Sequence, residues 1–357
     1  MVFALVACGP AHAQWQLENS GTTADLRGID NVGGGVAWAS GTNGTVLRTE
    51  DGGYQWQPCA VPPDAAKLDF RGIQAFDANT AIVMSSGTGD LSRLYKTTDG
   101  CQTWRLIFTN PDRDGFWDAV TFSGNRVGWL LGDPVHGQFQ IWETTDGGKS
   151  WTRESKSKAL SASARTAGAF AASNSVLSLS QRKSSFPIFG SGGISGAFFF
   201  FINEVTVCVD DCLAAPRDHW KKVAVPIGSN TESSGVFSLE MRDSTVGIAV
   251  GGDYKKPDES LRTAAYTGDA GDHWLPSQTP PHGYRSAVAY DDATKTWITV
   301  GPNGTDVSAD DGKNWRAVHP DATLHEAPDA DKNWNALSLP FVVGPKGRIG
   351  KLNRKTF

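Results

Sequence analysis

The sequence predicts an all-β fold built from repeated four-stranded units, and three observations support this prediction. The composition favours strands and tight turns, because 40 of the 357 residues are glycine, 13 are tryptophan and 17 are phenylalanine, whereas three are methionine. A turn motif recurs along the chain, mostly at intervals of 41 to 48 residues. Short apolar segments of strand length lie between its copies. A repeat of this length with four strands per unit is typical of a β-propeller.

The repeated turn has the pattern Ser/Thr-x-Asp-x-Gly-x-x-Trp, and one of its five copies carries Cys101 in place of the glycine. We expect the aspartate to accept hydrogen bonds from backbone N–H groups and so close the turn. The glycine supplies a positive φ, and the tryptophan opens the next strand and packs between sheets. The aspartates are therefore interpreted as structural and not catalytic. The five copies contain Asp51 and Trp56, Asp99 and Trp104, Asp146 and Trp151, Asp269 and Trp274, and Asp310 and Trp315.

Seven tryptophans in this register predict seven blades, and each is followed by a polar link and an apolar segment that we assign to an inner strand. The tryptophans are Trp15, Trp56, Trp104, Trp151, Trp220, Trp274 and Trp315. The expected inner strands cover residues 26–29, 70–73, 117–120, 168–170, 236–239, 284–287 and 334–337. The last unit, residues 334–352, has three strands and no following tryptophan. The first segment after Gln14 is an unpaired fourth strand, and pairing the two would close the ring and protect both edges.

The N-terminal residues are predicted to be a targeting segment and not part of the fold. Residues 1–13 are apolar and end in Ala11-His12-Ala13, which resembles a signal-peptide cleavage site, although a basic n-region is missing. A lipobox with lipid attachment at Cys8 is the alternative. Residues 14–357 then form a single propeller domain that is exported to the periplasm or the cell exterior. No apolar run approaches the roughly 20 residues that a membrane span requires.

Export places the remaining cysteines in an oxidising compartment. Cys208 and Cys212 bracket a short turn and are predicted to form a disulfide. Cys59 and Cys101 lie in consecutive repeats, and the sequence leaves open whether they pair or remain isolated buried thiols. No Cys-x-x-Cys pair is present and histidine is scarce near the cysteines, so we predict no metal site and no cofactor.

Charge and repeat register together predict a binding site at the mouth of the propeller channel. The net charge of -5 argues against a generally basic nucleic-acid-binding protein. Arg27, Arg71 and Arg285 each follow a large apolar residue at the start of an inner strand, which places them on one ring. Such a ring would bind a carboxylate, either on a small anionic ligand or on an acidic segment of a protein partner. The alternative is that the arginines pair with Asp118 and with neighbours such as Asp25 and Asp69. The full predicted mouth comprises Arg27, Arg71, Arg285, Asp118, Asn335 and Arg165.

The chain resembles the plant photosystem II stability/assembly factor family and its bacterial relatives. The resemblance spans residues 15–352 and is carried by the Thr-x-Asp-Gly-Gly-x-x-Trp turns, the Leu/Phe-Arg-Gly-Ile inner strands and the segments 129–133 and 298–304. The turns are similar to the Asp-box (BNR) repeats of sialidase-like propellers. This resemblance implies an exported, non-catalytic scaffold that binds a protein, for instance a membrane-protein complex during its assembly. Blade four departs from the family pattern around residues 180–201.

A sialidase-like glycoside hydrolase is the alternative function. The three arginines would bind a substrate carboxylate, Tyr284 with Glu232 or Glu326 would form the nucleophile pair, and Asp133 would be the acid. The Arg-Ile-Pro motif that marks sialidases is absent, because Phe70-Arg-Gly-Ile73 carries glycine and lies in blade two. The sequence also contains no serine nucleophile elbow, phosphate-binding loop or dinucleotide fingerprint. We therefore expect a binding scaffold.

Overall fold

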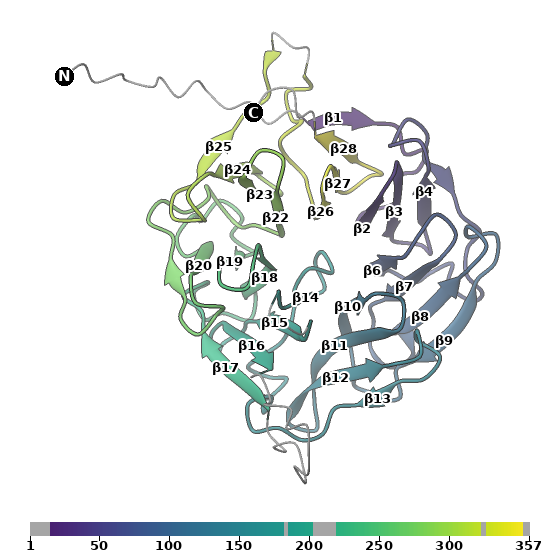
Figure 1. The fold of residues 1–357 in the computed structure, drawn as a ribbon, viewed down its shortest axis with the longest axis horizontal. Coiled ribbons are helices and arrows are strands. Elements are labelled where there is room, and N and C mark those ends of the chain that lie inside the picture. The colour runs from purple at the N-terminus through teal and green to yellow at the C-terminus, as the bar shows by residue number, and fades with distance from the viewer. Residues whose placement is uncertain (1–14, 182–184, 203–218, 323–325, 353–357) are drawn as a thin grey trace.

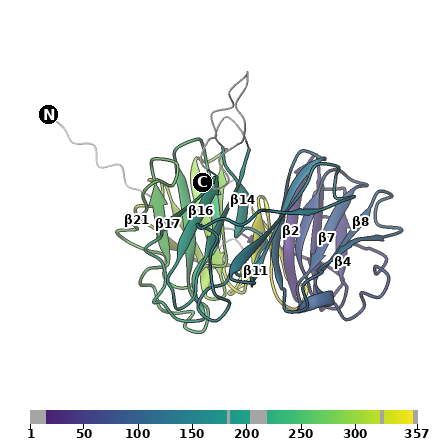
Figure 2. The same ribbon diagram turned by 90° about the horizontal axis from the view of Figure 1, so that it is seen from below.

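A computed structural model describes residues 15–181, 185–202, 219–322 and 326–352 of the chain. Seven antiparallel sheets of four strands each stand radially around a central axis (Figure 1). The view turned by 90° shows the blades side by side, with their strands running between the two faces of the ring (Figure 2). The predicted seven-bladed β-propeller is confirmed.

Each blade is named by its order along the chain, and its strands run from the channel outward. Blade one contains β2 (Leu26–Gly33), β3 (Val36–Gly41), β4 (Val46–Thr49) and β5 (Gln57–Pro58). Blade two contains β6 (Phe70–Ala75), β7 (Ala81–Ser85), β8 (Arg93–Thr97) and β9 (Arg105–Thr109), with a short 3-10 helix η1 (Gly89–Leu91) before β8. Blade three contains β10 (Trp117–Ser123), β11 (Val127–Val135), β12 (Gln138–Thr144) and β13 (Thr152–Arg153).

The second half of the ring follows the same order. Blade four contains β14 (Leu177–Leu179), β15 (Pro187–Ser191), β16 (Phe198–Ile202) and β17 (Trp220–Ala224). Blade five contains β18 (Ser234–Met241), β19 (Gly247–Asp253), β20 (Ala264–Thr267) and β21 (Leu275–Pro276). Blade six contains β22 (Ala287–Asp291), β23 (Thr296–Gly301), β24 (Gly304–Ser308) and β25 (Arg316–Val318). Blade seven contains β26 (Ala336–Ser338), β27 (Phe341–Val343), β28 (Ile349–Leu352) and β1 (Trp15–Glu18).

The repeated turn is closed by side-chain hydrogen bonds, as the sequence predicts. The hydroxyl group at its first position takes part in these bonds together with the aspartate. In the first copy the Thr49 hydroxyl donates to Asp51 Oδ1 (2.8 Å) and accepts the Gly53 N–H (3.0 Å). Asp51 Oδ1 also accepts the Gln55 N–H (3.0 Å). The other four copies make the same bonds, with φ positive at the glycine position. These aspartates therefore hold the turns together.

Hydrogen bonds from inner-strand side chains join successive blades. A polar side chain on the inner strand of one blade accepts a backbone N–H from the inner strand of the next. Burial raises the pKa of Asp30 to about 7 and that of Glu240 to about 8. The pairs are Asp30 with Ala75 (2.7 Å), Gln74 with Phe122 (3.1 Å), Glu240 with Tyr290 (3.2 Å) and Ser338 with Asn31 (3.0 Å).

The ring closes through β1, which pairs antiparallel with β28 so that Trp15 lies opposite Leu352. The Trp15 side chain is 1% exposed, and its ring centroid lies 6.1 Å from that of Trp334. Its Nε1–H donates to the Thr305 hydroxyl of blade six (3.1 Å). The predicted closure is confirmed. The Trp15 ring contacts residues of blades six and seven and so holds the first strand of the domain in place.

Cys59 and Cys101 form a disulfide, which answers the question that the sequence left open. The bond joins the segment after β5 in blade one to the turn after β8 in blade two. The predicted Cys208–Cys212 disulfide and the predicted targeting segment, residues 1–13, lie outside the described residues and stay predictions. None of the helices in the described part of the chain has the length and apolar character needed to cross a membrane.

The closure can be tested with Trp15→Ala. Removing this buried ring from the closure between β1 and β28 should lower the free energy of unfolding by about 3–5 kcal/mol. Chemical denaturation measures the loss. The control is Leu17→Ala on the same strand, where the side chain is 39% exposed and a surface substitution should cost about 0.5 kcal/mol or less. Equal stability of the two variants would contradict the role of Trp15 in closure.

The disulfide can be tested by removing both cysteines. Peptide mass spectrometry of oxidised, unreduced protein should find Cys59 linked to Cys101. Because the two residues are 42 positions apart, the double substitution to alanine should cost about 4 kcal/mol through the larger entropy of the unfolded chain. Free alkylation of both thiols in the oxidised native protein would show that the bond is not formed.

Candidate functional site

A β-bulge recurs at the same place on the inner strands of four blades. In blades one, two, three and five the register shifts by one residue near the start of the inner strand. A bulge re-aims the extra side chain, here toward the channel. The four bulged residues line one cavity of about 530 Å³ together with residues from blades six and seven. The side chains at this shared position are Arg27, Arg71, Asp118, Phe237, Ser286 and Asn335. We call this space the mouth cavity.

The predicted mouth position of Arg285 is wrong by one residue. Leu26, Arg285 and Trp334 hold equivalent places, because each donates its backbone N–H to a glycine carbonyl in the preceding blade. The acceptors are Gly344, Gly251 and Gly301, at 3.1, 2.9 and 3.3 Å respectively. Arg285 therefore occupies the buried place before the bulge position, and Ser286 takes the place at the mouth. In the sequence, Tyr284 resembles Leu26 and Phe70 because it is a large residue before an arginine, but it lies one position too early.

Arg285 is instead part of a buried ion pair in blade six. The side chain is 0% exposed. Its Nε donates to Asp306 Oδ2 (2.8 Å), Nη2 also bonds Asp306, and Nη1 donates to Asn303 Oδ1 (2.6 Å). Burial acts to raise the pKa of Asp306, but the hydrogen bond with His282 and the charge of Arg285 outweigh it and lower that pKa. Arg285 has a structural role.

Arg27 and Arg71 do lie together at the mouth cavity, and both reach the same carboxylate. Arg71 Nε donates to Asp69 Oδ2 (2.7 Å), and Arg27 Nε lies 3.5 Å from Asp69 Oδ1. The two arginine side chains remain 28% and 30% exposed. Pairing with Asp69 is one part of the alternative that the sequence suggested, whereas Asp25 accepts the backbone N–H of Lys346 instead. Two guanidinium groups thus share one carboxylate.

Residues 168–175 of blade four cross the channel, and we call them the channel plug. Asn174 binds both the N–H and the C=O of Val120 in blade three, at 2.9 and 3.0 Å. The Ser173 hydroxyl donates to the carbonyl of Ser286 in blade six, and Ser175 bonds Ser238 in blade five (2.7 Å). Contacts with blades on opposite sides of the ring show that the plug spans the channel.

The expected inner strand of blade four, residues 168–170, is therefore wrong. The inner strand is β14 at Leu177–Leu179, and Gly168 makes a single bridge with Gly192. The apolar character of this segment serves packing inside the channel, since the Phe170 ring stacks on Phe237 with centroids 3.9 Å apart. Four other blades have a one-residue bulge near the start of the inner strand. Blade four instead has a segment of several residues before its inner strand.

Two carboxylates line the mouth cavity next to Arg71. Asp118 is 1% exposed, and neither carboxylate oxygen has a hydrogen-bond partner among the described residues. Asp133 Oδ1 accepts the N–H of Ala169 in the channel plug (3.0 Å). Burial raises the pKa of Asp133 to about 6. Burial and the nearby charge of Asp133 raise the pKa of Asp118 well above its usual range, and Arg71 opposes them only in part.

Aromatic side chains form much of the remaining wall. Phe237 and Tyr284 make a T-shaped contact, with ring centroids 4.7 Å apart, and Phe237 also stacks on Phe170. The full aromatic lining comprises Phe116, Phe170, Phe237, Tyr254, Tyr284 and Trp334. Apart from Tyr284, which the hydrolase alternative includes, these residues were not predicted from the sequence as site residues. Aromatic side chains in a propeller are normally assigned to packing between blades.

The remaining predicted residues lie in a neighbouring hollow and in a distant link. Arg165 and Glu232 line a hollow of about 600 Å³ that shares Asp133 with the mouth cavity. Glu326 lies in the link before blade seven, where its Oε2 accepts the Asp321 N–H (2.6 Å). In the part of the chain that the structure describes, no group of three His, Cys, Asp or Glu side chains could hold a metal ion.

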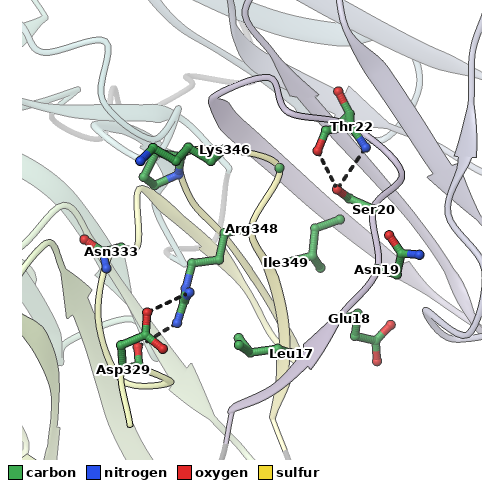
Figure 3. Close-up of a pocket in the computed structure, with 12 residues that line it drawn as sticks. Leu17, Glu18, Asn19, Ser20, Thr22, Asp329, Asn333, Lys346, Arg348 and Ile349 are labelled. Atoms are coloured by element: carbon green, nitrogen blue, oxygen red, sulfur yellow. Dashed lines mark hydrogen bonds and ion pairs between the residues drawn. The ribbon is translucent and has the colours of Figure 1, made fainter. Parts of the chain in front are cut away.

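A separate cavity of about 490 Å³ lies at the closure of the ring, between β1 and the end of blade seven (Figure 3). Its main cation, Arg348, is directed at Asp329, with hydrogen bonds of 3.1 Å to the carboxylate and 2.6 Å to the backbone carbonyl. The guanidinium also lies over the Trp334 ring at 4.7 Å from its centroid. Its charge is already matched, so we do not assign a ligand to this cavity.

Comparison with solved structures agrees with the fold. No protein-family model matches the chain, and no curated protein matches it either. YCF48 from Cyanidioschyzon merolae superposes with a TM-score of 0.62 at 20% identity, covering 96% of this chain and 99% of that one. YCF48 bound to D1 peptide gives 0.61 at 17% identity, with coverages of 96% and 98%. This chain shares the YCF48 fold. The likeness is consistent with the family resemblance seen in the sequence.

A glycoside hydrolase also carries a similar fold, but over less of its length. An ancestral GH74 enzyme superposes with a TM-score of 0.53 at 13% identity, over 92% of this chain and 41% of the enzyme. Identities this low establish a shared fold alone. Any function must therefore be argued from the side chains of the mouth cavity.

The structural role of Arg285 can be tested with Arg285→Ala. Loss of the guanidinium breaks a buried ion pair and leaves His282 as the remaining charged or polar side chain on Asp306, so the free energy of unfolding should fall by about 3–5 kcal/mol. Chemical denaturation measures this loss. Arg165→Ala, at an exposed position, is the control and should change stability by about 0.5 kcal/mol or less. An Arg285→Ala protein of unchanged stability would contradict the buried ion pair.

Proposed function

We propose that this chain is a non-catalytic propeller that binds a peptide segment of a partner protein in the mouth cavity, as a scaffold or assembly factor. The observation that supports this most is the shared position at the start of the inner strands, which brings side chains from six blades to one cavity that the channel plug also lines. An open cup with aromatic walls and charged side chains suits the side chains of a segment lying across the rim. The solved structure of YCF48 bound to D1 peptide supports a peptide as the ligand class.

Arg27 and Arg71 are proposed to hold an acidic group of that segment. The two guanidinium groups share Asp69, which leaves one positive charge of this pair uncompensated. Both side chains keep part of their surface exposed, so a carboxylate can approach without displacing Asp69. Charge-assisted hydrogen bonds of this kind are about twice as strong as neutral ones and are specific in direction. The acidic contact predicted from the sequence is thus retained with two arginines instead of three.

The chemistry of Tyr284 argues against the hydrolase alternative. Burial raises the pKa of this phenol further above its already alkaline range. A nucleophile needs the opposite shift or an adjacent base that removes its proton.

We include export in the proposal, because the predicted targeting segment precedes the domain. The proposed partner class is a membrane-protein complex under assembly.

Site-specific crosslinking in the native host tests the function. A photo-crosslinking phenylalanine derivative replaces Tyr254, which lines the mouth cavity and is 48% exposed, or Tyr54, which is 85% exposed on the outer turn of blade one. Crosslinking from position 254 should capture one defined segment of a partner, and crosslinking from position 54 should not. Equal or random capture from both positions would contradict a binding site at the mouth.

The arginine contact is tested on the captured segment. Combined Arg27→Gln and Arg71→Gln should weaken its binding by about tenfold, or 1.4 kcal/mol, and should flatten the decrease in affinity with salt. Arg105→Gln, at an exposed position on the outer strand β9, is the matched control. Titration of the purified proteins measures the effect. Unchanged affinity in the double variant would remove the two arginines from the site.

A further inference from the structure

The mouth cavity has a basic side and an acidic side. Arg27 and Arg71 come from blades one and two, whereas Asp118 and Asp133 come from blade three. Asp69 lies between the two arginines. When all five groups are ionised, three negative charges face two positive ones. The cavity then carries one net negative charge, which a purely acidic ligand would increase.

Asp118 is the group whose hydrogen bonding is incomplete. A carboxylate that is buried without a donor is strongly destabilised, so it must hold a proton or receive a donor from a ligand. Within the described residues neither oxygen of Asp118 receives one. Asp133 is better satisfied, because Ala169 of the channel plug donates to it. The cavity thus contains a buried acceptor that faces the space where a ligand would bind.

We propose that Asp118 and Asp133 form a subsite for a basic side chain, a lysine ammonium or an arginine guanidinium, of the bound peptide segment. This inference rests on the proposed function and extends it: the segment carries a basic residue close to the acidic residue that Arg27 and Arg71 hold. A basic group supplies the donors that Asp118 lacks and cancels the excess negative charge. Its alkyl stem packs along the aromatic wall while its charge meets the carboxylates.

The aromatic lining supports a cation at this place. Phe170 and Phe237 stack on each other and line the same cavity as the two carboxylates, and Tyr254 lies against Phe237 with centroids 6.1 Å apart. Aromatic faces attract cations, and the attraction is larger where water is excluded. Arg71 faces Asp118 as well, but its guanidinium is held by Asp69 and by the carbonyl of Ala171 (3.2 Å). Arg71 therefore leaves Asp118 available to a ligand.

The proposal has a pH dependence of definite sign. In the free protein the pKa of Asp133 is about 6 and that of Asp118 is raised, so both hold protons at low pH. A bound cation favours the ionised carboxylates, so binding releases protons and affinity rises from pH 5.5 to pH 8. An acidic ligand alone favours the protonated carboxyls and shows the reverse trend. The other charged or titratable side chains around the two carboxylates are Arg27, Arg71, Asp69, Tyr254 and Tyr284.

Synthetic peptides test the subsite. The probes are acetylated and amidated polyalanine peptides that contain one lysine and one glutamate, adjacent or separated by a few alanines, and matched peptides with norleucine in place of lysine. Calorimetric titration at pH 5.5 and pH 8, in two buffers of different protonation enthalpy, gives both affinity and proton release. The best lysine peptide should bind about tenfold tighter than its norleucine partner at pH 8. The preference should shrink at pH 5.5.

Substitution of the two carboxylates provides the second arm. Combined Asp118→Asn and Asp133→Asn should abolish the preference for lysine and the proton release, while the glutamate contact with Arg27 and Arg71 remains. Asn keeps an acceptor for the Ala169 N–H and removes buried charge, and thermal unfolding checks that the variant folds. Asp272→Asn, on the exposed turn after β20, is the matched control and should retain the preference.

The outcomes separate this inference from the proposed function. Equal binding of lysine and norleucine peptides to the wild-type protein, or lysine preference that survives in the double variant, overturns the basic subsite while a peptide-binding mouth stands. Absence of binding by every lysine–glutamate probe also overturns it. Crosslinking from position 254 decides the proposed function independently, because that experiment assumes no sequence for the partner segment.

Discussion

The hydrogen bonds between the inner strands of successive blades are the interaction on which the rest of the structure depends. An inner strand is an edge of its sheet, and its outward N–H groups would be unpaired in the channel without side chains from the neighbouring blade. Asp30 and Glu240 provide such acceptors as acids with raised pKa values of about 7 and 8. Their contribution to stability is complete at acid pH and is lost as pH rises through those values. Gln74 and Ser338 make equivalent contacts without a charge.

The channel plug converts this ring into a cup. Asn174 adopts a positive φ of 67° and, from one side chain, binds the backbones of blades two and three. The same segment presents Ala169 to Asp133 and Phe170 to Phe237. The one blade that departs from the repeat thus forms the floor of the mouth cavity and orients an acid in its wall. Without the plug, the residues at the bulge position would surround an open, water-filled channel.

Repetition made most of the fold predictable, because each turn motif marks one blade. The strand closure was also predictable, since only the first and last segments lacked a partner. Arg285 was predicted to lie at the mouth, where the structure has Ser286. The sequence nevertheless contains a pattern that identifies the correct residue. A small residue followed by an aliphatic one comes directly after the mouth position, as in Gly28-Ile29, Ala119-Val120 and Ala287-Val288. That pattern selects Ser286. The pairing of Cys59 with Cys101 depends on how two blades pack, and the crossing of residues 168–175 depends on space inside the channel, so periodicity could indicate neither.

Equivalent positions in a propeller share backbone geometry but carry different side chains. The mouth cavity therefore has different chemistry on its different sides. The bulge places arginine in blades one and two, aspartate in blade three and phenylalanine in blade five at matched positions around one axis. When Asp118 is ionised, opposite charges on adjacent blades produce a local dipole across the cavity. The overall charge of -5 has little influence there, because surface charges more than about 10 Å away are screened at ordinary ionic strength. Under the proposed function, a ligand would be selected by the order of charges around the ring, and the repeated backbone holds those side chains at regular intervals.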